Sequence, residues 1–307
     1  MLEEGFLKVS DIHSIYYAVC GNKKGIPVLF VHGGPGGCSS GLNDIDGLDF
    51  DRFFYIVYDQ RGCGKSIPNG ELKDNTTNEA ISDIKKLLDY LNIKKVIISA
   101  SSWGACLSLI FSENYPNMVK NMFLRSTFLA TENEINWLYN ESYKIFPDLY
   151  EKFMKPIISE SKKDNIAKYL LEKMNNSNYE EKGKIACFMA NYEHALMLMT
   201  FSNSNFKKPE DLEENDINST KLFLHYESNH YFIENDYIIK NADKIKNIPI
   251  IFYHGRFDMN CTINNVYELH KILPNSKLII VPYESHSGIL LKDLQRNDIK
   301  DFGQICT

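Results

Sequence analysis

The stretch "KVIISASSWGACLSLIFSENYP", residues 95–116, joins two segments of different character. Its first part, "KVIISA", is a β-branched apolar block of the kind that forms a buried strand. Its second part is an amphipathic segment that reads as a helix closing near Pro116, because proline cannot continue a helix. Two adjacent serines, Ser101 and Ser102, stand at the junction. A strand that runs into a helix is the repeating unit of a parallel α/β sheet.

The same alternation continues on both sides of this stretch. Thr76 and Glu79 form a capping-box pattern before a segment whose apolar residues recur at helical spacing. Further along, "NNVYELHKIL" at 264–273 predicts a helix between two apolar blocks. Such alternation implies right-handed crossovers and a mostly parallel central sheet, with ligands beyond the carboxyl ends of its strands. The predicted strands are 14–20, 27–31, 53–59, 95–100, 121–124, 248–255 and 277–283.

Residues 126–241 interrupt this alternation. Aromatic-rich segments with helical periodicity, such as "ENEINWLYNESYKIF" at 132–146, follow one another there without a convincing strand. The sequence therefore predicts an α/β core formed by residues 1–125 and 242–307, with residues 126–241 inserted as a helical cap.

Composition narrows the class of protein. The chain has 307 residues, 44% of them hydrophobic, which is enough for a large core. Its net charge of -6 and scattered basic residues indicate neither a nucleic acid nor an anionic membrane as partner. The N-terminus has no long apolar run, and the seven cysteines lack a CxxC pair, so we expect free thiols in the cytoplasm. The oligomeric state stays open.

Ser102 is the better candidate nucleophile of the two serines. It directly follows a strand and stands two residues before Gly104, which is half of the nucleophile elbow that raises a serine hydroxyl above a sheet. Ser101 lacks a glycine two residues later. The other glycine of the elbow is replaced by Ala100, which adds one methyl group at a crowded turn. Alone, this local pattern fits an ordinary turn serine equally well.

Two later strand ends supply partners for Ser102. Asp258, in "HGRFDMNC", follows the strand at 248–255, and His286, in "VPYESHSG", follows the strand at 277–283. The chain order Ser, Asp, His is that of the α/β-hydrolases. We therefore predict that fold, with His286 as the base and Asp258 as the carboxylate that orients it. Taken singly, Asp258 could cap a helix and His286 could be an ordinary loop residue.

Other residues compete less well for these roles. His32 and His254 each precede a glycine at a strand end, where we expect an imidazole bonded to backbone. Cys63, Cys106 and Cys261 do not stand on a strand-to-helix elbow.

The glycine-rich segment "VHGGPGG" at 31–37 follows another strand. Successive glycines allow backbone amides to turn inward and hold a developing oxyanion. We predict the amides of Gly34 and Trp103 as its donors.

Longer motifs in the sequence indicate which family of proteins the chain resembles. "HGGPGG" and "YDQRGCGKS" are accompanied by "IFPDLYEKFMKPI" at 145–157 and "NHYF" at 229–232 within the predicted cap. The chain resembles the prolyl aminopeptidases (proline iminopeptidases), serine peptidases of the α/β-hydrolase fold. The resemblance implies removal of N-terminal proline from short peptides, with no metal or organic cofactor.

An aminopeptidase must hold the charged amine of its substrate, and a buried carboxylate does so best. The resemblance assigns this role to Glu193, which could otherwise be a solvated helix residue. The family's second amine-binding glutamate precedes "NHYF", where this chain has Ser228, and the nearest acid is Glu227. One residue on a helix means about 100° of rotation, so Glu227, which we name as a candidate substrate-binding residue, reaches the amine only if the local backbone shifts.

The resemblance also implies an apolar slot for the proline ring. Its matching positions are Phe128, Phe232 and Cys261, with Trp137 and Leu138 close by. Such residues could equally belong to the core of the cap. Arg125 matches a family arginine beside the site, and Ser126 replaces the family's next residue, a glycine.

Two other functions fit the same residues. The first is an esterase or amidase of this fold that acts on small neutral acyl substrates, in which the unmatched second glutamate has no amine to bind. The second is a non-catalytic relative that uses the fold for binding.

Overall fold

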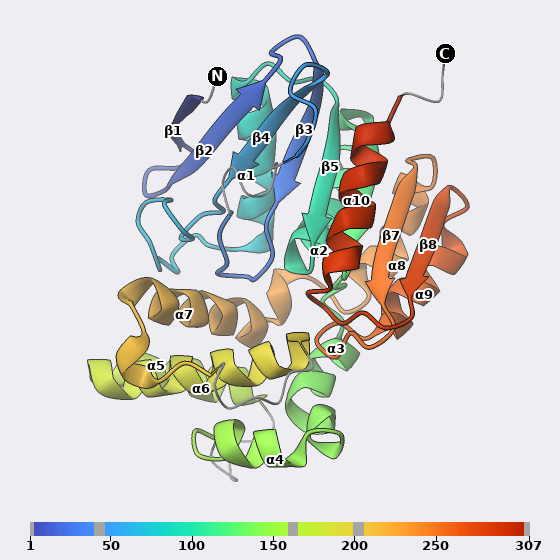
Figure 1. Ribbon diagram of the computed structural model, residues 1–307. Helices are drawn as coiled ribbons and strands as arrows, with labels where there is room; N and C mark the ends of the chain where they lie inside the picture. The colour runs from blue at the N-terminus through green and yellow to red at the C-terminus, as the bar shows by residue number, and fades with distance from the viewer. Residues whose placement is uncertain (1–2, 40–46, 159–164, 199–205, 304–307) are drawn as a thin grey trace.

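The computed structural model describes residues 3–39, 47–158, 165–198 and 206–303. These residues form an eight-stranded sheet with the order β1-β2-β4-β3-β5-β6-β7-β8 (Figure 1). The strands are β1 (Glu3–Lys8), β2 (Ser14–Gly21), β3 (Ile26–Val31), β4 (Phe53–Tyr58), β5 (Val96–Ser101), β6 (Val119–Arg125), β7 (Ile250–Gly255) and β8 (Ser276–Val281).

The sheet is antiparallel at one edge and parallel through its centre. β2 pairs antiparallel with β1 and β4, and the strands from β4 to β8 are parallel to their neighbours. This confirms the predicted mostly parallel α/β sheet. β1 has no counterpart among the predicted strands, because "EEGFLK" at this exposed edge contains no continuous apolar block.

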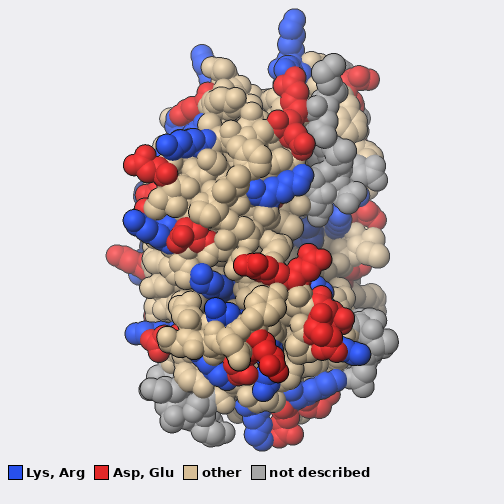
Figure 2. Space-filling view, turned by 90° about the vertical axis from the view of Figure 1, so that its left-hand side faces the viewer, with Lys and Arg blue, Asp and Glu red and all other residues tan. Residues whose placement is uncertain are grey.

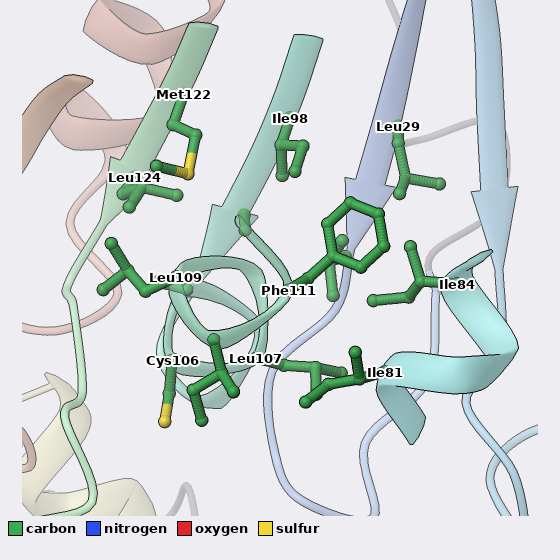
Figure 3. Packing of buried hydrophobic residues seen from close by; sticks show 14 of the residues in the cluster. Leu29, Ile81, Ile84, Ile98, Cys106, Leu107, Leu109, Phe111, Met122 and Leu124 are labelled. Carbon is green, nitrogen blue, oxygen red and sulfur yellow. The ribbon is translucent and has the colours of Figure 1, made fainter. Parts of the chain in front are cut away.

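Helices cover both faces of the sheet (Figure 1). α1, α2, α8 and α9 pack on one face, where buried residues of β3, β5 and β6 meet them, and α10 covers the other. Figure 3 shows α2 end-on, with Leu107 and Phe111 directed toward neighbouring strands and α1. The bounds are α1 (Thr77–Tyr90), α2 (Trp103–Asn114), α8 (Tyr237–Asn241), α9 (Ile263–Ile272) and α10 (Ile289–Asp301).

Between β6 and β7 the described residues form only helices and turns, beyond the carboxyl ends of the parallel strands (Figure 1). They have their own apolar cluster. α8 is an exception, because Ile238 packs in the cluster beneath the sheet although the predicted boundary at 241 places it in the cap. The cap helices are α3 (Glu132–Asn136), α4 (Pro147–Leu149), α5 (Ile166–Asn176), α6 (Tyr179–Leu198) and α7 (Glu214–Ser228), with π turns at Trp137–Glu141 and Tyr150–Met154. Short 3-10 turns lie at Pro116–Met118, Ser142–Lys144, Pro209–Asp211, His230–Phe232 and Ala242–Ile245.

α7 is fastened to the core along its length. A Cβ on Gly36, after β3, would collide with the carbonyl oxygen of Ser219, so the two backbones touch there. Side chains and backbone carbonyls of the loop at 69–77 also bond to α7, and we call this line of contacts the seam. Its hydrogen bonds are Asn69–Asn215 (2.9 Å), Asn218–Asn69 (3.0 Å), Lys221–Gly70 (3.3 Å), His225–Asn75 (2.9 Å) and Tyr226–Asn75 (2.8 Å).

The surface carries charges of both signs. Figure 2 shows lysine and arginine interspersed with aspartate and glutamate on one face of the molecule. None of the helices in the described part of the chain has the length and apolar character that crossing a membrane requires.

Candidate active site

Ser102 occupies a strained turn between β5 and α2. Its φ of 55° and ψ of -128° are unusual for a residue with a side chain. The turn is held by a hydrogen bond from the Ser102 amide to the Arg125 carbonyl (3.0 Å). Gly104 follows because a Cβ there would collide with the carbonyl oxygen of Val31. The strain and close approach are those of an elbow that exposes a serine.

Ala100 fits where the elbow pattern asks for glycine. It is the fifth residue of β5 and is buried, with a carbonyl that accepts a hydrogen bond from Gln295 Nε2 (3.1 Å). Its extended backbone has no need of a positive φ, so the methyl group is accommodated in the strand.

Asp258 and His286 form a buried pair. Both carboxylate oxygens of Asp258 lie 2.9 Å from Nδ1 of His286. Oδ1 also accepts backbone hydrogen bonds from Asn260 (3.1 Å) and Cys261 (2.8 Å). Burial alone would raise the pKa of Asp258, but the contact with His286 and these hydrogen bonds lower it below its ordinary value. Asp258 is therefore held as a carboxylate that can orient an imidazole.

The loop that carries His286 is fixed from β6. Ser126 has a φ of 50° and donates a hydrogen bond from Oγ to the His286 carbonyl (2.7 Å). The positive φ explains why a glycine suits this position, and the hydroxyl of Ser126 adds a tie to the loop. The rival imidazoles bond to backbone as expected, His254 with the Cys261 carbonyl (2.8 Å) and His32 with the Gly33 carbonyl (2.8 Å).

Ser102 and His286 face a common space between the strand ends and the cap. We call it the outer cavity, and its volume is about 430 Å³. Arg125 at the end of β6 also lines it, with Nε 3.4 Å from Gln295 Oε1. The outer cavity is lined by Gly34, Ser102, Arg125, Glu193, Phe223 and His286, among others.

A smaller inner cavity of about 40 Å³ adjoins the outer one. The two share five wall residues, which are Gly34, Ser102, Glu193, Phe223 and Asn260. The further walls of the inner cavity are apolar or carry a carboxyl group. They are Phe128, Leu138, Tyr231, Cys261, Glu134 and Glu227.

Two glutamates from different cap helices meet at the inner cavity. Burial raises the pKa of Glu193, on α6, to about 7, although His286 opposes the shift. Burial and the neighbouring Glu193 raise the pKa of Glu227, on α7, to about 8, against a hydrogen bond from Tyr139. Two carboxyl groups that line one small cavity, with Glu227 buried and Glu193 partly buried, could hold a cation.

Glu227 lines the inner cavity, where a candidate amine-binding residue has to lie. Its side chain is 3% exposed, whereas Ser228 is partly exposed and donates a hydrogen bond to the His225 carbonyl (3.1 Å). α7 ends at Ser228, and the following turn His230–Phe232 has φ values of 49°, 54° and 54°. The backbone therefore leaves its helical path after Ser228, so the helical rotation does not extend into "NHYF".

The structure places two predicted slot residues elsewhere. Phe232 packs on His225 and Tyr226, with ring centroids 5.1 and 5.6 Å apart, and is not among the residues that line the inner cavity. The left-handed turn directs Tyr231 there instead. Trp137 donates from Nε1 to the Met259 carbonyl (2.7 Å) and Leu138 lines the cavity. Phe128 and Cys261, two further positions predicted for the slot, line the inner cavity.

Sequence reasoning missed Glu134 and Tyr231. Glu134 closes a capping box with Thr131 and accepts the Leu129 amide (3.2 Å). Burial raises its pKa to about 7. The Thr-x-x-Glu pattern before an apolar run could have indicated this local role. Tyr231 stacks on Trp103 and Phe128, and only its position within "NHYF" pointed to it.

The amides predicted for an oxyanion lie beside Ser102. Trp103 is the first residue of α2, and an amide in the first turn of a helix has no intrahelical acceptor. Gly34 lines both cavities next to Ser102. The indole of Trp103 donates to Gln60 Oε1 (2.9 Å), and Gln60 donates to the His32 carbonyl (2.8 Å). This chain of bonds connects the β3 loop to the elbow.

The chain is similar in sequence to known α/β hydrolases and proline iminopeptidases. The sequence profile described as "alpha/beta hydrolase fold" matches residues 26–293. The chain is 37% identical to the "Probable proline iminopeptidase" of Leptolyngbya boryana, over 93% of this chain and 88% of that protein. It is 33% identical to the proline iminopeptidase of Arabidopsis thaliana, over 92% of this chain and 75% of that protein.

Among solved structures, a bromoperoxidase from Bacillus anthracis superposes with a TM-score of 0.65. The match covers 99% of both chains at 18% identity. At this identity the likeness shows the fold alone.

Proposed function

The chain belongs to the proline iminopeptidase family of α/β hydrolases, and we propose that it releases N-terminal proline from short peptides. The single observation that carries the proposal is the pair Glu193 and Glu227 beside Ser102. A protonated substrate amine, which is a pyrrolidinium group in N-terminal proline, would bring a positive charge to the two carboxyl groups. A neutral ester would leave that pair without a cation.

The reaction would proceed by acyl transfer. His286 takes the proton of Ser102, whose oxygen attacks the prolyl carbonyl carbon while the amides of Gly34 and Trp103 hold the oxyanion. The peptide nitrogen leaves with the proton from His286. Water, deprotonated by His286, then attacks the acyl-enzyme and releases proline. Asp258 keeps the imidazole in the required tautomer and stabilises its protonated form.

The shape of the site supports an exopeptidase. The inner cavity is small and is lined by the carboxyl-bearing residues Glu193 and Glu227, so an amine bound there would belong to the end of a substrate. Phe128, Leu138 and Cys261 offer apolar contacts to a pyrrolidine ring. The larger outer cavity is on the side of the leaving peptide. Cytoplasmic action is part of this proposal and is supported by the free thiols of the six cysteines in the described residues.

A paired substrate assay tests the proposal. A prolyl-arylamide with a free amine and its N-blocked counterpart differ only in the group that Glu193 and Glu227 would bind. We expect kcat/KM for the free amine to exceed that for the blocked substrate by about 100-fold, the value of a charge-assisted interaction in a buried site. Equal rates, or faster cleavage of short esters, would instead favour the esterase or amidase.

Active-site labelling separates an enzyme from a non-catalytic relative. A fluorophosphonate should label the wild-type protein stoichiometrically at Ser102 and leave a folded Ser102→Ala variant unlabelled. Ser101→Ala is the matched control, and it should still be labelled because the neighbouring hydroxyl has no elbow geometry. A folded wild-type protein that resists the reagent would refute the acyl-enzyme mechanism.

A further inference from the structure

Tyr139 lies on the π turn Trp137–Glu141, which presents three consecutive side chains to different parts of the site. The turn closes with a hydrogen bond from the Ser142 amide to the Trp137 carbonyl. Trp137 reaches the Met259 carbonyl, Leu138 lines the inner cavity, and the Tyr139 hydroxyl donates to Oε2 of Glu227. Such turns are uncommon and often occur at functional sites.

The surroundings of Glu227 leave Tyr139 as its hydrogen-bond donor among the described residues. Glu193 faces it from α6, and Tyr231 faces it from the turn after α7. Glu134 also lines the inner cavity. Each carboxyl neighbour disfavours a negative charge on Glu227, whereas the Tyr139 hydroxyl favours it.

Glu227 also separates two spaces. A second cavity of about 170 Å³, which we call the rear cavity, is lined by Glu132, Ile135, Tyr139, Ala167, Glu227 and His230, among others. Glu227 lines both the inner and the rear cavity, whereas Tyr139 lines only the rear one of these two and is 3% exposed. Tyr139 therefore contacts Glu227 from the side of the rear cavity.

We propose that Tyr139 is a positioning residue for the amine site: its hydroxyl holds one oxygen of Glu227 and thereby directs the other to the substrate amine. The inference rests on the proposed function and names a specificity-determining residue within it. Tyr139 itself does not touch the reacting atoms.

The electrostatic reason lies in the balance at Glu227. Burial and Glu193 raise the pKa of this carboxyl group, and the hydrogen bond from Tyr139 lowers it. Burial and the nearby Glu227 raise the pKa of Tyr139 well above its ordinary value, so its hydroxyl stays protonated and remains a donor. Without that donor, Glu227 holds its proton to higher pH and loses both its fixed position and its charge.

Tyr139→Phe tests the inference because it removes the hydroxyl and keeps the ring in the wall of the rear cavity. We expect kcat/KM for the free-amine prolyl-arylamide to fall about tenfold, chiefly through KM, with kcat and the N-blocked substrate little affected. The acidic limb of the kcat/KM profile between about pH 6 and pH 9 should move to higher pH. A loss shared equally by both substrates would overturn the inference.

Tyr143→Phe is the matched control. Tyr143 belongs to the same cap segment, is 42% exposed and packs on Tyr150 with centroids 5.6 Å apart, so losing its hydroxyl should alter neither substrate.

A double-mutant cycle keeps the test informative if Tyr139→Phe loosens the cap. If Tyr139 acts through Glu227, Tyr139→Phe should have no further effect in a Glu227→Gln background. Additive losses would refute the inference. Its failure is distinguishable from that of the proposed function, because the latter fails if the wild-type protein itself shows no preference for the free amine.

Discussion

Asp258 and Glu227 are equally buried carboxyl groups with opposite electrostatic environments. Each is 3% exposed. Asp258 is surrounded by His286 and the amides of Asn260 and Cys261, and its pKa lies below the ordinary value. Glu227 has Tyr139 as donor and Glu193 as neighbour, and its pKa is raised to about 8.

The two carboxyl groups differ in whether the protein itself supplies a positively charged partner. The protein itself supplies the partners of Asp258, which include His286 and also His254 on β7, with Nε2 3.5 Å from Oδ2, so Asp258 is ionised before any ligand arrives. The described part of the chain brings no lysine or arginine into an ion pair with Glu193 or Glu227. Their missing partner is a cation, which on the proposed function comes with the substrate.

Asp258→Asn should have the largest effect, because it removes the charge that stabilises protonated His286. We expect kcat to fall by about 10⁴-fold for free-amine and N-blocked substrates alike. The measurement is steady-state kinetics on both, with circular dichroism to establish that the variant is folded. A loss confined to the free-amine substrate would contradict the assignment of Asp258 to catalysis and of Glu227 to amine binding.

Glu227→Gln should have a smaller and selective effect. A neutral amide cannot form an ion pair with the substrate amine, so kcat/KM for the free-amine prolyl-arylamide should fall by about 10 to 100-fold. The blocked substrate should be unaffected. Ser228→Ala, at the position matched to the family glutamate by counting, is the control and should behave as wild type. If Ser228→Ala instead weakens amine recognition, the assignment to Glu227 is wrong.

The same two groups predict a pH dependence of stability. Glu193 and Glu227 have raised pKa values, so the folded state retains protons that the unfolded state has released, and the unfolding free energy falls as pH rises from about 4.5 to about 8. Glu227→Gln should reduce this fall by up to about 5 kcal/mol, because each unit of the pKa difference between 4.5 and about 8 corresponds to about 1.4 kcal/mol. Urea unfolding at several pH values measures it. An unchanged pH dependence would show that Glu227 is ionised without a ligand.

Ala100→Gly should have the smallest effect. Restoring the usual glycine of the elbow removes a buried methyl group from β5, and we expect the unfolding free energy to fall by about 0.5–1 kcal/mol. The rate of fluorophosphonate labelling should stay the same. A faster labelling rate would indicate that the methyl group of Ala100 constrains Ser102.

The strands and the positions of Ser102, Asp258 and His286 at strand ends could be predicted because their signals are local. Apolar blocks and glycine-rich loops mark where strands end, and parallel strands bring those ends to one edge. The elbow needed only the residues from Ala100 to Gly104. β1 was not predicted, because this exposed edge strand contains no continuous apolar block.

The cap side of the site could be predicted only in part, because its geometry depends on tertiary packing. Propensities do not anticipate three left-handed residues at His230–Phe232. That turn is stabilised where Tyr231 stacks on Trp103 and Phe128. It turns Phe232 away from the inner cavity and places Tyr231 in the cavity wall. The π turn likewise sends Trp137 and Leu138 in directions that helical spacing does not give.

The seam along α7 has a mechanical consequence. Gly36 and the loop at 69–77 join this helix to the core, so Glu227 keeps a fixed distance from the strand ends. α6, which carries Glu193, packs mainly on other cap elements. If the cap opens, α6 should therefore move relative to α7, and the distance between Glu193 and Glu227 should increase. Amide hydrogen exchange should be slower along α7 than along α6, and the reverse order would exclude this hinge.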